Sequence, residues 1–286
     1  CDIINLSLYY LEPYLPTLIS KTYRYGKFSS NIYQPIVAKV ELPKRWFQHF
    51  YIFAAPGSSF VLYLVIHEYL WKGNVHECFI WILDMCLGSS RQPLVSSEST
   101  FVASVLMTLQ CWKRFYETQY INIFSDRKMN ISHYLVGYVH YVGALMCIVG
   151  ESEGFVRGSE GNFSWKRITY FHFICAFIFI SSSYAQLRAN IILRNLRKNK
   201  DGEIDHKIYK IPHGGLFEYV SGALQITEIM MYMTLSMILW QSSSYHYVTL
   251  WVLANQISTA VLTHQWYIET FKNYPKSRKI LIPFIF

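Results

Sequence analysis

Four polar side chains recur at helical spacing in the second half of the chain. Gln186, Asn190, Arg194 and Arg197 follow one another at intervals of four, four and three residues. These intervals place all four on one face of a helix. Amide and guanidinium groups on one face favour an anion, because guanidinium groups fork onto phosphate oxygens. The alternative is a basic helix end that reaches phospholipid headgroups along its apolar stems.

Two further pairs of polar residues interrupt apolar stretches. Glu228 precedes Tyr232 by four residues, and His264 precedes Tyr267 by three. An unpaired carboxylate in apolar surroundings is costly, so Glu228 must pair with a cation, a backbone amide or the amide of a ligand. A functional site and a buried structural pair both satisfy this condition. His264 is either a catalyst or, as is more frequent for a lone histidine, a satisfied interior residue.

The sequence lacks the motifs that hold metals or bind phosphate through glycine-rich loops. It has neither paired Cys-x-x-Cys motifs nor clustered histidines, and no GxGxxG or GxxxxGK[ST] pattern. We therefore predict no metal site. A nucleotide must bind by a route other than a Rossmann loop.

The chain that positions these residues is strongly apolar. It is 52% hydrophobic, 17% aromatic and only 15% charged, whereas soluble domains carry about 25% charged residues. A helix needs about 20 apolar residues to cross a membrane. Such runs cover residues 47–70, 79–112 with a polar break at 88–98, 131–150, 168–187, 216–240 and 247–271, with a partial run at 3–19. Since the chain begins at Cys1 instead of Met, we expect the first helix to be incomplete.

The predicted fold is an all-α integral membrane protein of about seven transmembrane helices that enclose a cofactor and lipid-substrate cavity. Linkers and repeats are absent from the sequence. We therefore predict a single transmembrane domain over residues 1–286.

The basic residues are sorted between the predicted spans. Of the 26 Lys and Arg residues, 21 lie in the segments 20–46, 113–130, 188–213 and after 271. Loops rich in Lys and Arg stay in the cytosol, so we predict a cytosolic carboxyl terminus. The net charge of +8 then indicates attraction to anionic lipid or cofactor, and no nucleic acid partner is predicted. Sequons at Asn5 and Asn162 fall on the opposite side, in agreement with the endoplasmic reticulum membrane.

The carboxyl-terminal stretch 267–286 closely resembles the ending of the steroid 5-alpha-reductase family. Residues 209–222, with Glu228 after them, resemble the cytosolic loop and sixth helix of that family. Segments 25–27, 43–51 and 195–200 resemble its polyprenol (polyprenal) reductase branch. The likeness spans almost the whole chain.

The resemblance implies an NADPH-dependent enzyme that reduces the alpha-isoprene double bond of a polyprenyl lipid on the way to dolichol. It also implies which residues hold the cofactor: Gln186, Asn190, Arg197, Tyr209, Lys210, Glu228, His264, Tyr267 and Arg278. Arg197, Lys210 and Arg278 suit the phosphates. Positive charge at 194–198, including Arg194, favours NADPH over NADH.

The sequence departs from the steroid-reducing members where the substrate is expected. In those members a Gln-Glu pair follows Trp-Phe on the second helix, and the Glu is thought to engage the substrate carbonyl. Here Trp46 and Phe47 are followed by Gln48, His49 and Phe50, so no carboxylate is available. His49 is a candidate proton donor because histidine titrates near neutral pH. The alternative is a histidine at a helix start near headgroups.

The tyrosine that partners this Glu in steroid reducers aligns near Cys111, so its role is unfilled or passes to Tyr116 or Tyr120. We expect Trp46, Phe50 and Cys111 to contact the substrate. The aromatic residues expected along the lipid path, or in helix packing, are Phe47, Phe50, Tyr51, Phe53 and Tyr63.

Chemistry favours polyprenal as the direct substrate. Hydride adds to an alkene only if the electrons have an acceptor, which a conjugated aldehyde offers and an allylic alcohol does not. Three alternatives remain: a 3-oxo-5-alpha-steroid 4-dehydrogenase, a trans-2-enoyl-CoA reductase, or a seven-span receptor or carrier. The second shares the arrangement Lys113-Arg114-x-x-Glu117-Thr118. The expected partners are the polyprenyl lipid and the bilayer.

Overall fold

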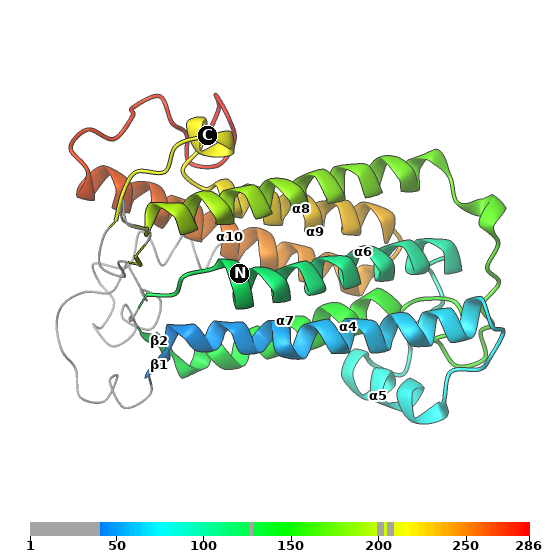
Figure 1. Cartoon of the computed structure of the whole chain (residues 1–286). Helices are drawn as coiled ribbons and strands as arrows, with labels where there is room; N and C mark the ends of the chain where they lie inside the picture. Colours follow the sequence, from blue (N-terminus) through cyan, green and yellow to red (C-terminus); the bar gives the residue numbers. More distant parts are fainter. Residues whose placement is uncertain (1–40, 126–127, 199–202, 205–208) are drawn as a thin grey trace.

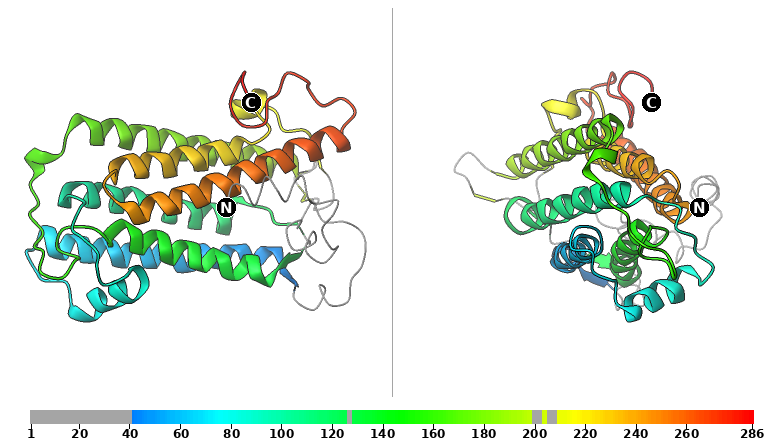
Figure 2. Two further views of the ribbon diagram at one scale, coloured as in Figure 1. Left: turned by 180° about the vertical axis from the view of Figure 1, so that it is seen from behind. Right: turned by 90° about the vertical axis from the view of Figure 1, so that its right-hand side faces the viewer.

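The computed structural model describes residues 41–125, 128–198, 203–204 and 209–286, in which long helices alternate in direction along one common axis (Figure 1). The long helices are α4 (Gln48–Tyr69), α6 (Ser97–Tyr116), α7 (Ile131–Val149), α8 (Tyr170–Leu196), α9 (Ala223–Ile238) and α10 (Ser243–Thr270). Seen end-on, α8, α9 and α10 lie to one side of α6, with α4 and α7 on the other (Figure 2). Helix α6 is thus central to the bundle.

Three helical segments within the described ranges are long and apolar enough to cross a membrane: Lys44–Tyr69, Ile131–Val149 and Tyr170–Leu196. Helix α9 is apolar but shorter. Large apolar side chains on α8 point away from the bundle, with Phe173 64% and Phe177 73% exposed, as lipid-facing residues would be. The fold is therefore mostly helical and membrane-compatible. The predicted run 3–19 lies outside the described residues.

One detail confirms the sequence prediction and another differs from it. The polar break expected at 88–98 is present: it divides the run 79–112 into α5 (Glu77–Leu87) and α6, and Arg91 draws the intervening loop inward by donating to the Gly150 and Phe155 carbonyls and pairing with Asp84 at 2.6 Å. The chain is, however, not purely α-helical. Strands β1 (Glu41–Pro43) and β2 (Lys128–Asn130) pair antiparallel, which brings the starts of α4 and α7 together.

One end of the bundle is closed by carboxylates that accept backbone N–H groups. Glu68 accepts from Val75 and Gly161, both at 3.2 Å, and Glu98 accepts from Ser164 at 2.7 Å. Gly154 adopts φ +79° beside Glu68, where a Cβ would lie 2.4 Å from the carboxylate. These bonds satisfy loop backbone that would otherwise be costly to bury.

The opposite end holds the described parts of the segments rich in Lys and Arg. The amino ends of α4, α7 and α9, the carboxyl ends of α6, α8 and α10, and the tail after α10 all gather there (Figure 1). Inside the bundle, fully buried alanines on facing helices, such as Ala54, Ala103 and Ala144, let α4, α6 and α7 approach closely.

Candidate functional site

Gln186 on α8 joins two other helices through its side-chain amide. Its Oε1 accepts from Gln110 Nε2 at 2.9 Å and from Lys113 Nζ at 2.7 Å, and its Nε2 donates to the Glu228 carboxylate. Gln186 is buried, and Glu228 is partly buried on α9. The structure thus brings together two of the predicted cofactor residues through a contact between α6, α8 and α9.

The same hydrogen bonds continue across α6 to α4. Lys113 Nζ lies 3.1 Å from Glu117, and Arg114 also pairs with Glu117, whose side chain is fully buried. Arg114 Nε then donates to the Tyr51 hydroxyl at 3.2 Å, and the guanidinium lies 4.8 Å from the Tyr51 ring centroid. We call the chain Glu228–Gln186–Lys113–Glu117–Arg114–Tyr51 the interior network.

The charges of the interior network balance. Lys113 and Arg114 carry two positive charges, and Glu117 and Glu228 carry two negative ones. Ions in an apolar interior are tolerated when they are paired and hydrogen-bonded. Glu117 begins the π-helical turn Glu117–Ile121 that follows α6, and its carboxylate lies within ion-pair distance of both cations. Such turns occur frequently at functional sites.

Asn190 continues the inward face of α8 one turn beyond Gln186. It is 5% exposed, and its Nδ2 has no hydrogen-bond acceptor in the part of the chain that the structure describes. Buried amide groups are normally satisfied, so this donor is available to a ligand. Arg194, partly buried, follows after another turn. Arg197 caps α8 and donates to the Ile123 carbonyl at 2.9 Å.

The chain after α10 folds back along the start of α9. Backbone N–H groups of Ser221 and Gly222 donate to the carbonyls of Lys279 and Ile280, both at 2.9 Å. Gly222 is required by close packing, since a Cβ there would lie 2.9 Å from both the Ala260 Cβ and the Ile280 carbonyl oxygen. The returning tail therefore covers the ends of α9 and α10.

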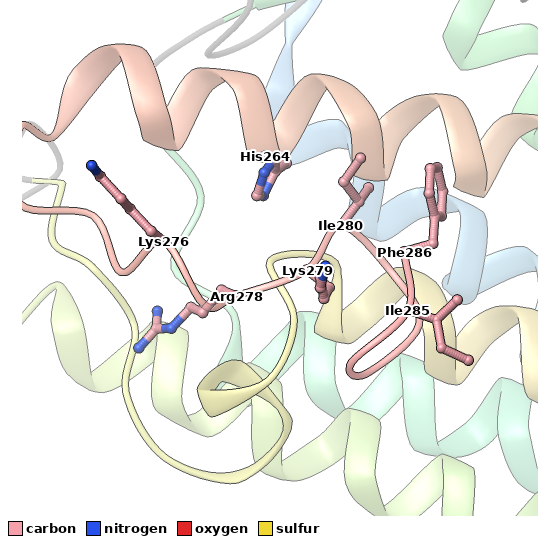
Figure 3. Close-up of a pocket in the computed structure, with 7 residues that line it drawn as sticks. All are labelled: His264, Lys276, Arg278, Lys279, Ile280, Ile285 and Phe286. Atoms are coloured by element: carbon pink, nitrogen blue, oxygen red, sulfur yellow. The ribbon is translucent and has the colours of Figure 1, made fainter.

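A pocket of about 300 Å³ lies between the tail and α10 (Figure 3). His264 points into it from α10, while the tail supplies three cations and three apolar side chains. We call it the tail pocket; its lining residues are His264, Lys276, Arg278, Lys279, Ile280, Ile285 and Phe286. Its positive charge suits an anionic group such as a phosphate.

Hydrogen bonds and ring stacking fix the walls of the tail pocket. The Ser221 hydroxyl lies 2.6 Å from His264 Nδ1 and 2.7 Å from the Tyr274 hydroxyl. Tyr274 stacks on Tyr267 with ring centroids 5.2 Å apart. Arg278 is 3% exposed and donates to the Pro212 carbonyl at 2.8 Å. The tail thus brings together His264, Tyr267 and Arg278, three further predicted residues.

A carboxylate on the 3-10 turn Gly215–Glu218 helps to hold the loop before α9. The Gly214 N–H donates to Glu218, and this bond, aided by the charge of Arg278, lowers the pKa of the Glu218 carboxyl below its ordinary value. Arg278 NH2 lies 3.6 Å from the Glu218 carboxylate. The tail and the loop are therefore joined through Arg278.

Other predicted residues lie apart from these two groups. Tyr209 packs edge-on against Trp266 at 5.1 Å, and Lys210 is exposed. Tyr116 is 54% exposed and stacks obliquely with Tyr120, which is 67% exposed. Both tyrosines face away from the interior network.

The predicted substrate residues lie at the start of α4 and on α6. His49 Nδ1 lies 3.0 Å from the Tyr134 hydroxyl of α7, and the rings of Trp46 and Phe50 also contact Tyr134. Cys111 is 1% exposed and faces the core from α6. These residues therefore line the interior between α4, α6 and α7.

Sequence reasoning missed the middle of the interior network. Gln110, which donates to Gln186 beside the network, was not singled out, and the hydroxyl of Tyr51 was given no role beyond an aromatic path. Lys113, Arg114 and Glu117 were noted only for a resemblance to another enzyme. Their spacing of i, i+1 and i+4 carried the signal, since a buried helix end with two cations needs an anion one turn away.

Comparisons with known proteins agree on one family. A family model described as 3-oxo-5-alpha-steroid 4-dehydrogenase matches residues 160–286. The chain is 38% identical to polyprenal reductase of Drosophila melanogaster over 282 residues, which cover 96% of this chain and 86% of that protein. It is 31% identical to polyprenal reductase of Caenorhabditis elegans (96% and 89% covered) and 31% identical to that of Homo sapiens (86% and 78%). The chain belongs to the polyprenal reductases of the steroid 5-alpha-reductase family.

Proposed function

We propose that this protein is a membrane oxidoreductase that uses NADPH to reduce the alpha-isoprene C=C bond of polyprenal, in support of dolichol synthesis for N-glycosylation. Similarity over 96% of the chain to a polyprenal reductase supports the substrate class. The observation that carries the proposal is the interior network, which joins the expected cofactor residue Glu228 to helix α4, where the substrate is expected.

The residues present fit a nicotinamide nucleotide. Asn190 offers a buried amide donor, Nδ2, that has no hydrogen-bond partner among the described residues. The buried Nε of Arg278 likewise has no hydrogen-bond partner among them. The Glu228 carboxylate can accept from a carboxamide. Lys276, Arg278 and Lys279 bring positive charge to the tail pocket, which favours phosphate groups and the additional phosphate of NADPH. When bound, NADPH would supply the hydride.

The site must also stabilise the charge that reduction creates. When hydride reaches the beta carbon of an unsaturated aldehyde, the electron pair moves onto the carbonyl oxygen. A hydrogen-bond donor aimed at that oxygen lowers the barrier most when water is excluded. The aromatic side chains at the start of α4, among them Trp46 and Phe50, provide an apolar wall for the isoprene chain. Cys111 adds to this wall from α6.

His49, Tyr116 and His264 remain candidates for proton transfer by sequence. The contacts favour His49 and His264, since Tyr116 faces outward. His49 shares a hydrogen bond with Tyr134, and His264 shares one with Ser221. Both bonds can orient an imidazole ring toward a ligand.

The proposed setting is a seven-span, single-domain protein of the endoplasmic reticulum membrane with a cytosolic carboxyl terminus. The described parts of the Lys- and Arg-rich segments gather at one end of the bundle, which supports this orientation. Asn162 is exposed at the other end. Expression in microsomes should give a glycosidase-sensitive mass shift that Asn162→Gln removes, provided that Asn5 is also replaced. If neither Asn5 nor Asn162 carried a glycan, this result would contradict the orientation.

The direct test uses the protein in lipid bilayers with NADPH and four separate substrates: polyprenal, polyprenol, a 3-oxo-4-ene steroid and an enoyl-CoA. Consumption of NADPH is followed by its absorbance. Polyprenal should be turned over and the others barely. Faster turnover of the steroid or of the enoyl-CoA would replace the proposed substrate, and binding of no NADPH would favour a receptor or carrier.

A further inference from the structure

Tyr51 lies where the interior network meets the helix expected to contact the substrate. It follows Phe50 on α4 and is 4% exposed. Its ring packs edge-on against Tyr141 of α7 at 5.3 Å and against Phe47 at 5.7 Å. The phenol is therefore held in one place by packing on two sides.

The hydrogen bond with Arg114 leaves the Tyr51 proton unused. Arg114 Nε donates to the hydroxyl, and a guanidinium has no acceptor. The hydroxyl therefore accepts this bond with its oxygen. The neighbouring Tyr141 hydroxyl also interacts with the Tyr51 oxygen as a donor, so among the described residues neither Arg114 nor Tyr141 takes up the Tyr51 proton. A buried hydroxyl that accepts from a cation and keeps a free proton is a strong donor toward a ligand oxygen.

The position of Arg114 is fixed in turn. Its guanidinium pairs with the buried Glu117, which also pairs with Lys113, and Lys113 bonds to Gln186. The positive charge over the Tyr51 ring is thus set before any ligand binds. Donors that are oriented in advance stabilise a developing oxyanion without reorganisation.

Neighbouring hydroxyls are less suited to this role. The Tyr232 hydroxyl already shares a hydrogen bond of 2.7 Å with His140. Tyr245 is buried at the start of α10, close to the end closed by the Glu68 and Glu98 carboxylates. Tyr116 faces outward. Tyr51 alone among these is linked by hydrogen bonds to Glu228.

We propose that Tyr51 is a catalytic residue that donates a hydrogen bond to the aldehyde oxygen of the substrate, with Arg114 as its positioning residue. This inference rests on the proposed function. It assigns the carbonyl-binding role that no carboxylate at the start of α4 can fill. The negative charge that develops on the oxygen is stabilised by the hydrogen bond from Tyr51, whose hydroxyl the adjacent guanidinium holds in place.

The test compares Tyr51→Phe with Tyr245→Phe in lipid bilayers. Tyr51→Phe keeps the ring and removes only the hydroxyl, and loss of one oxyanion donor lowers kcat by about 10²- to 10³-fold. Its affinity for NADPH, measured by quenching of protein fluorescence, should stay unchanged. Tyr245→Phe, which removes a buried hydroxyl that has no partner among the described residues, should keep kcat within about threefold of the unmodified protein.

Arg114→Lys tests the positioning role. It should lower kcat in the parent protein but have little further effect in Tyr51→Phe, since Arg114 acts through the Tyr51 hydroxyl. A purely structural role for Arg114 would instead give the same loss in both backgrounds. Additive losses would therefore overturn the assignment of Arg114.

The outcomes separate the two proposals. If the unmodified protein does not turn over polyprenal with NADPH, the proposed function fails. If it does, and Tyr51→Phe is as active as Tyr245→Phe, the role of Tyr51 is overturned. Should Tyr51→Phe fail to fold, 3-fluorotyrosine at position 51 provides a stronger acid of nearly the same size, and an unchanged kcat would overturn the inference equally.

Discussion

The buried pairing of Glu117 with Arg114 and Lys113 predicts a large loss of stability in Glu117→Gln. The Glu117 side chain is fully buried, whereas those of Arg114 and Lys113 are 12% and 18% exposed. The substitution keeps size and shape but leaves both cations without their nearest anion. Removing one partner of a buried ion pair costs about 3–5 kcal/mol.

This cost can be measured as a shift in melting temperature. For a chain of this size about 2 °C is lost per kcal/mol, so Glu117→Gln should melt about 6–10 °C below the parent. Glu269→Gln, at an exposed position in the last turn of α10, is the matched control and should melt within about 1 °C of it.

A second variant separates loss of pairing from loss of side-chain packing. Arg114→Gln combined with Glu117→Gln removes both charges, so the double variant should be less destabilised than the sum of the single variants. The pairing as described would be refuted if Glu117→Gln melted at the same temperature as Glu269→Gln. It would also be refuted if the losses of stability in the two single variants added up exactly in the double variant.

Three further predictions concern the cofactor and the tail. Glu228→Gln should fold normally but bind NADPH about 10- to 100-fold more weakly, because a hydrogen bond to a charged group is lost; unchanged affinity in a fluorescence titration would remove Glu228 from the site. Asn190→Ala should weaken NADPH binding about fivefold without lowering the melting temperature, since its Nδ2 has no partner in the described chain; the reverse pattern would make Asn190 structural. Glu218, whose pKa is lowered by Gly214 and Arg278, stabilises the tail above the ordinary pKa of 4.5, and this contribution is lost as the pH falls through its folded value. Glu218→Gln should therefore raise protease cleavage of the tail at pH 7, and this increase should shrink as the pH is lowered below 4.5; an effect of the same size at every pH would exclude the carboxylate.

Helical spacing predicted the inward face of α8 because the period of a helix fixes which residues share a side. Gln186 and Asn190 are buried as that spacing requires, and Gln186 meets Glu228. The break in the run 79–112 was predicted at 88–98, but the contacts of Arg91 with the Gly150 and Phe155 carbonyls were not, because these carbonyls lie far along the chain.

Residues at the end of α6 were harder to interpret. By composition Lys113 and Arg114 belong to a cytosolic basic segment, and only the fold shows that they turn inward toward Glu117 and Gln186. The same rotation of α6 leaves Tyr116 exposed. The contact of Ser221 with His264 and Tyr274 likewise depends on the tail folding back, which no local pattern encodes.

Transfer of a labelled hydride tests the central claim most directly. The protein in lipid bilayers is given polyprenal and NADPH that carries deuterium at the transferred position, and the product is analysed by mass spectrometry and NMR. The account predicts one deuterium at the beta carbon of a saturated aldehyde. Deuterium on the former aldehyde carbon, with the double bond retained, would contradict it.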